Sequence, residues 1–336
     1  MERAIEKLIY YRLIALWILC EAMLGGILHG FKIPVTGLIV GSSAVVCISL
    51  IAYYTSSKGS ILKATLIVAI FKMMLSPQAP LTAYFAVFFQ GLMGEALFWN
   101  RKMYAFSCFL LGVVVLLESG LQRIIILTIV YGKDLWNAIN IYINGITGQT
   151  ILTNYSFFLI AAYIVLHLIV GISIGLGIGR LPHKIQLWTE IHKNYLFTLP
   201  KKNVKTEILF PAVKRKRKFL KSFVIIWCVL LLFYFQTFTP QIYVKIFIRS
   251  LLILLICYFI IGPILTLLLT QWLQKKQIKE YAHIQKILQM LPDTKQLVIK
   301  SWQLSAIKKG IHRIWLCSKI ILVNTFYTLD NEVPSD

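Results

Sequence analysis

Acidic residues are scarce in this chain. Its 336 residues include 13 Asp and Glu against 35 Lys and Arg, which gives a formal net charge of +22 at pH 7. Such a balance suits nucleic-acid binding, but no motif of nucleic-acid-binding proteins accompanies it. Instead, 12 of the basic residues fall between Arg180 and Lys221 and 10 between Lys275 and Lys319, beside apolar segments. This distribution is typical of the cytoplasmic loops of membrane proteins and argues against a nucleic-acid partner.

Motifs of catalysis and energy conversion are also missing. The chain has no Walker A motif, no HExxH or GxSxG sequence and no aspartate-rich diphosphate motif. Its six cysteines show no CxxC or paired spacing, and most lie in apolar runs, where a thiol behaves as a small hydrophobe. We therefore expect no enzyme, no metal site, no disulfide framework and no cofactor. An intramembrane enzyme is the least favoured alternative.

Hydrophobic residues, by contrast, make up 58% of the chain, more than a soluble domain of this size can bury. Runs long enough to cross a bilayer predict an all-α membrane protein of about eight transmembrane helices, the first of them uncleaved. These runs are Leu8–Leu28, Pro34–Tyr54, Ile61–Leu75, Leu81–Trp99, Met103–Val130, Tyr155–Ile178, Phe219–Thr237 and Tyr243–Trp272.

The distribution of lysine and arginine in the loops predicts the orientation. If the N-terminus lies inside, both basic blocks lie inside too, and every short loop obeys the positive-inside rule. We therefore expect a multi-pass protein of the plasma membrane with both termini in the cytoplasm. The expected parts are a six-helix unit (1–180), a basic cytoplasmic connector (181–218), a transmembrane helical hairpin (219–272) and a basic amphipathic tail (273–336).

Polar side chains inside the predicted spans are the candidate binding residues, because an ionisable group at a helix centre costs about 2.5–3.5 kcal/mol. Counting along each helix places most of them in the outer half of the membrane and Gln90 near its middle. Lys72 could pair with either of two glutamates, and structural ion pairing competes with ligand binding as an explanation. The candidate substrate-binding residues are Glu21, Lys72, Gln90, Glu118, Gln122 and Arg123.

Two further ionisable residues have simpler interpretations. Glu95 lies near the cytoplasmic end of its span, where it could pair with Arg101 at the interface. His167, alone on an apolar helix, is more typical of a hydrogen-bonded core residue than of a ligand.

Small residues recur at fourfold spacing and predict close helix contacts. They are Ala22 and Gly26 in the first span and Gly171, Gly175 and Gly179 in the sixth. Packing within the chain competes with docking of a separate membrane subunit as their explanation.

The most distinctive stretch runs from Ser76 to Glu95 (SPQAPLTAYFAVFFQGLMGE), a proline-bounded loop that leads into a helix with Gln90, Gly91 and Gly94. With six spans and both ends inside, residues 1–180 resemble the substrate-binding S component of energy-coupling-factor transporters. The resemblance implies capture of a vitamin-like or amphipathic small molecule at the outer face. It also implies a coupling membrane subunit and two ATPases as partners. Ala15, Ala22 and Gly26 match that family's small-residue docking motif in part.

The tail after the last span supports a competing hypothesis. Ile278–Leu291 predicts an amphipathic helix ended by Pro292, and Ile311–Leu329 is apolar but interrupted by basic residues. Both could lie on the anionic inner leaflet or on a cytoplasmic partner. The alternative function is therefore a non-catalytic scaffold that recruits a cytoplasmic or membrane partner.

Overall fold

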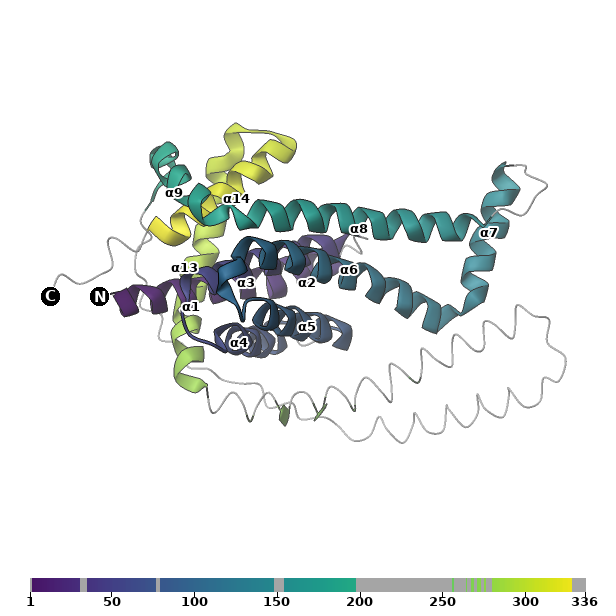
Figure 1. Cartoon of the computed structure of the whole chain (residues 1–336), viewed down its shortest axis with the longest axis horizontal. Coiled ribbons are helices and arrows are strands. Elements are labelled where there is room, and N and C mark those ends of the chain that lie inside the picture. Colours follow the sequence, from purple (N-terminus) through teal and green to yellow (C-terminus); the bar gives the residue numbers. More distant parts are fainter. Residues whose placement is uncertain are drawn as a thin grey trace. The chain divides into compact units, whose positions relative to one another are not determined.

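The structure is a computed structural model that describes residues 2–30, 35–76, 79–147, 154–197 and 280–327, with seven isolated positions between 256 and 275. These described segments are helices joined by turns, and they contain no strand (Figure 1). The chain is therefore all-α where it is described, as predicted. The predicted span Phe219–Thr237 and most of Tyr243–Trp272 lie outside the described residues, as does 198–218 of the basic connector.

The first helices follow the predicted apolar runs to within a few residues. Helix α1 (Glu2–Ile18) continues through a π-helical turn, η1 (Leu19–Leu24), into α2 (Gly25–Gly30). The next three are α3 (Thr36–Tyr54), α4 (Ser60–Leu75) and α5 (Leu81–Leu97). Their contacts form a core in which Trp17, Phe71 and Ile48 are fully buried. Gly59, with φ of 78°, supplies the left-handed residue that begins α4.

Three later helices extend the apolar part of the chain. After the short η2 (Arg101–Met103) come α6 (Tyr104–Tyr131), α7 (Lys133–Thr147) and α8 (Tyr155–Gly179). Among the described residues, α3, α6 and α8 are long and apolar enough to cross a membrane, and α5 is a shorter apolar helix. Large side chains such as Ile169 and Leu176 of α8 are exposed, which suits a lipid environment better than water.

Shorter helices complete the description. They are α9 (Leu181–Ile191), η3 (Lys193–Tyr195), α13 (Tyr281–Leu304), η5 (Ser305–Ile307) and α14 (Gly310–Tyr327). The prediction that Pro292 ends its helix is wrong, because α13 continues through it for three more turns. Buried residues on both sides of the proline, including Ile287 and Leu297, hold the two halves in place despite the missing backbone donor.

The described residues fall into two compact units. The first contains residues 2–120, 166–197 and 280–327, so that α13 and α14 belong with the N-terminal helices: α13 crosses α1, and α14 packs against α9 (Figure 1). The second contains the end of α6, α7 and the beginning of α8, where the Asn140 side chain accepts a hydrogen bond from the Ser156 backbone N–H at 2.7 Å. The predicted four-part division of the chain stays a prediction.

Candidate functional site

A buried ion pair joins η1 to the last turn of α4 in the first unit. Lys72 Nζ of α4 lies 2.7 Å from Glu21 Oε2, with side chains only 7% and 2% exposed. The same ammonium donates a hydrogen bond to the Ala83 backbone oxygen of α5 at 3.3 Å. Of the two glutamates that could pair with Lys72, the structure selects Glu21. Three segments of the chain therefore meet at one lysine.

The backbone at Glu21 is unusual. Glu21 lies in the π-helical turn η1, and π-helical turns within helices occur frequently at functional sites. Ser76, which follows α4, donates its hydroxyl to the Ala22 backbone oxygen at 3.1 Å, so the turn is tied to α4 by two adjacent residues. The turn therefore presents Glu21 to α4 in a fixed position.

Several buried polar atoms of the first unit have no hydrogen-bond partner among the described residues. They are Glu21 Oε1, Trp17 Nε1, Gln90 Oε1 and both carboxylate oxygens of Glu118. Buried polar groups in native structures are almost always hydrogen-bonded, so each unpartnered atom calls for an explanation, and a bound molecule is one of them. Most of these atoms are acceptors, which suits a solute that carries N–H or O–H donors.

The remaining predicted site residues do not all lie at the height of the Glu21–Lys72 ion pair along the helix axes. Gly25 lies beside Val40, and Gly41 lies beside Leu116, so α3 connects the end of η1 to α6. Gly37 also lies beside Ser119, so counting along the helices places Glu118 roughly 9 Å beyond Glu21 along the helix axis, between one and two turns.

Gln90 belongs to a different level of the first unit. Its neighbour Gly91 lies against Thr65, which is two turns, or roughly 10 Å, from Lys72. Gln122 and Arg123 belong to the second compact unit.

The predicted small-residue stripe of α8 faces α6. A β-carbon at Gly171 or Gly175 would lie within 3 Å of α6 backbone atoms, and one at Gly179 would lie 3.3 Å from Ala105. The described contacts of this stripe are therefore within the chain. His167, one turn before the stripe, is fully buried, with its ring over Gly120. Ala22 of η1 is buried, and Gly26 of α2 is exposed.

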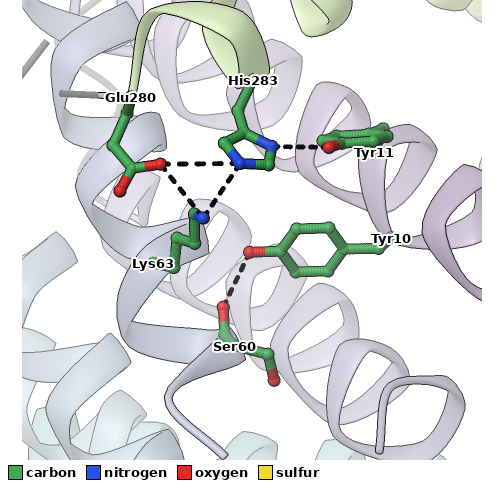
Figure 2. A network of polar contacts seen from close by, with 6 residues as sticks. All are labelled: Tyr10, Tyr11, Ser60, Lys63, Glu280 and His283. Carbon is green, nitrogen blue, oxygen red and sulfur yellow. Dashed lines mark hydrogen bonds and ion pairs between the residues drawn. The ribbon is translucent and has the colours of Figure 1, made fainter. Parts of the chain in front are cut away.

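A second polar cluster joins the C-terminal helices to α1 and α4 (Figure 2). His283 of α13 lies between Tyr11 and Lys63: its Nδ1 is 2.5 Å from the Tyr11 hydroxyl and its Nε2 is 3.0 Å from Lys63 Nζ. Lys63 also forms an ion pair with Glu280 at 3.1 Å, and Tyr10 donates to the Ser60 backbone oxygen at 2.9 Å. This cluster (Tyr10, Tyr11, Ser60, Lys63, Glu280 and His283) fixes α13 across α1 and α4.

The partners of His283 determine its protonation state. A lysine ammonium can only donate, so Nε2 must accept from Lys63, and Nδ1–H must then donate to Tyr11. Burial lowers the pKa of His283 below its usual value of 6.5, and the nearby Lys63, Lys286 and Lys7 lower it further, whereas Glu280 opposes them. The docked helix therefore holds a neutral imidazole.

Acidification is expected to loosen α13. Because the pKa of His283 is lower when α13 is docked, the undocked form binds the proton more readily. The neutral imidazole of His283 therefore makes its full contribution to the free energy of α13 docking above about pH 6.5. This contribution decreases as the pH falls towards the lower pKa that His283 has in the docked form. Hydrogen exchange measured at pH 7.5 and 5.5, and corrected for the intrinsic pH effect, should show reduced protection of α13 relative to α3. His283→Gln should remove most of this difference; an equal difference in that variant would contradict the assignment.

Glu95 has a structural role that its sequence position did not reveal. Its carboxylate accepts from the backbone N–H groups of Gly59, Ile61 and Leu62 at 2.6–3.3 Å, at the start of α4. It thus satisfies donors at a helix N-terminus that would otherwise lack partners. Sequence analysis also missed Tyr11, Lys63 and His283, because each is an ordinary interfacial or amphipathic position when read alone.

The buried polar groups near the ion pair are therefore a carboxylate with one unpartnered oxygen, a lysine and an indole N–H, set among apolar side chains. In the part of the chain that the structure describes, no three metal-binding side chains come together. No protein family model matches this chain, and no curated protein or solved structure is significantly similar to it.

Proposed function

We propose that this chain is the small-molecule-binding and translocating subunit of a multi-subunit transporter in the plasma membrane. It would cross the bilayer about eight times, with both termini in the cytoplasm, and capture a solute at the outer face. The apolar helices and the distribution of the basic residues support this arrangement.

The observation that carries the proposal is the buried pair of Glu21 and Lys72. Each charge is costly in an apolar bundle, and ionisable residues inside membrane proteins are by default markers of ligand or ion pathways. A purely structural pair would satisfy both carboxylate oxygens, whereas Glu21 Oε1 has no partner within the described residues. A solute with an N–H or O–H group could bind there.

The proposed partners follow from what the chain lacks. It has no Walker A motif, so ATP-driven movement of the solute would need separate ATPases and a coupling membrane subunit. The resemblance of residues 1–180 to S components supports the same assembly. In this assembly Gly26 remains a candidate docking residue, since Ala22 is buried and the α8 stripe is covered by α6.

The test is ligand retention by the full-length protein after gentle detergent purification. Mass spectrometry of co-purifying small molecules should detect a metabolite in the wild type and lose it in the double variant Glu21→Leu/Lys72→Met, which removes both charges together. The matched control is Lys63→Met/Glu280→Leu, which removes an ion pair of the same residue types in the cluster of Figure 2. Equal retention in all three proteins would refute the proposed site.

The scaffold hypothesis makes a different prediction for the same samples. It expects a co-purifying protein but no small molecule, and no effect of the Glu21 and Lys72 substitutions on that protein. Deleting everything after Arg180 is a poor test of it, because this would remove α13 from α1 and expose a buried face.

A further inference from the structure

The turn between α13 and α14 carries an unusual number of exposed apolar side chains. Ile307 is 73% exposed and Ile311 is 83% exposed, on either side of Gly310, whose φ of 57° reverses the chain. Three more large apolar residues nearby are also exposed: Trp302, Ile314 and Trp315. Ile311, Ile314 and Trp315 share one face of α14, because they are spaced by three and four residues. A surface of this kind is normally covered by something.

The charge around this turn has one sign. Residues 294–329 contain six Lys and Arg and no acidic residue. Lys308 and Lys309 are exposed at the turn itself, and the Arg313 guanidinium lies 4.0 Å from the centre of the Trp302 ring. Basic residues mixed with Trp and Ile are typical of segments that lie in the headgroup region of an anionic membrane.

The position of α14 brings this surface close to the bilayer. Helix α9 begins at Leu181, two residues after the apolar helix α8 ends at Gly179. Helix α14 packs directly on α9: the Trp188 and Trp315 rings are 5.9 Å apart, and Lys319 lies over both. Trp188 is seven residues, or roughly 10 Å, along α9 from its start, so α14 packs on a short helix that begins where the apolar helix α8 ends.

We propose that the turn surface, defined by Trp302, Ile307–Ile311, Arg313, Ile314 and Trp315, binds anionic phospholipid. The apolar side chains enter the headgroup boundary, and Lys308, Lys309 and Arg313 contact the lipid phosphates. A protein partner would need acidic groups to match this surface, whereas an anionic leaflet supplies them beside the end of α8. This inference does not depend on the proposed transport function.

The experiment uses the full-length chain in lipid nanodiscs. Hydrogen exchange of the amides of 307–315 is compared between discs of phosphatidylcholine alone and discs that also contain phosphatidylglycerol. We expect exchange about fivefold slower or more in the anionic discs, the effect of roughly one lysine at an anionic surface. The double variant Lys308→Glu/Lys309→Glu should lose this protection, whereas Lys102→Glu/Lys133→Glu, which changes two exposed lysines elsewhere, should keep it.

Exchange in α3 serves as the internal check that each variant is folded. If the reversed-charge variant fails this check, Ile311→Ser replaces it and should weaken the same protection. Equal exchange of 307–315 in both kinds of disc would overturn the proposal. Protection that appears only when a second protein co-purifies would also overturn it, because the surface would then be a protein-docking site.

Discussion

Replacing Lys72 with Met is expected to destabilise the folded protein by about 3–5 kcal/mol, because Glu21 is left as a buried charge without its partner. Glu21→Leu should have a similar effect through the unpaired ammonium. The double variant should recover most of the loss, since an apolar pair of similar volume removes both desolvation penalties at once. Thermal unfolding of the four proteins in detergent gives the coupling energy directly.

The same four proteins also distinguish a role of the ion pair in folding from a role in ligand binding. If the pair serves only the fold, the double variant regains stability and nothing else changes. If it belongs to the solute site, the double variant is stable but has lost its ligand. Additive effects of the two single substitutions would show that Glu21 and Lys72 do not interact, contrary to their separation of 2.7 Å.

Gly175→Ala is expected to separate α8 from α6. A β-carbon at this position would lie 2.7 Å from Phe109 Cα and 2.8 Å from the Phe109 carbonyl oxygen. Backbone atoms cannot rotate away as a side chain can, so the helices themselves must move. Overpacking of this kind costs about 1–3 kcal/mol.

The control for this prediction is two residues away. Gly177 lies on the same helix, but a β-carbon there meets nothing within 4 Å. Gly177→Ala should therefore be neutral or gain up to about 1 kcal/mol from the higher helix propensity of alanine. Melting temperatures and hydrogen exchange of α6 and α8 distinguish the two variants. Equal behaviour of both would mean that the Gly175 face is not packed.

Helix positions were largely predictable from the sequence, whereas the pairing of side chains was not. In an apolar environment the backbone must satisfy its own hydrogen bonds, so the length of an apolar run defines a helix. The predicted Tyr155–Ile178 differs from the observed α8 by one residue at its C-terminal end. Helix rise also placed Glu21 and Lys72 at similar depth. It could not show which way each side chain faces, and the π-helical turn changes that facing at Glu21.

Helices that are only partly apolar were harder to predict. Helix α7 lies between two predicted spans, and because polar residues interrupt its apolar ones, no apolar run of spanning length marks it. The docking of α13 depends on His283 contacting Tyr11 and Lys63, which are 272 and 220 residues away in the sequence. Nothing local in the sequence encodes such a contact.

That separation has a consequence for synthesis. Chains grow at roughly 5–20 residues per second, so His283 is made roughly 15–50 s after Tyr11, its hydrogen-bond partner. During this interval the face of α1 that α13 later covers is open to other proteins. This face of α1 therefore stays without its cover until α13 has been made.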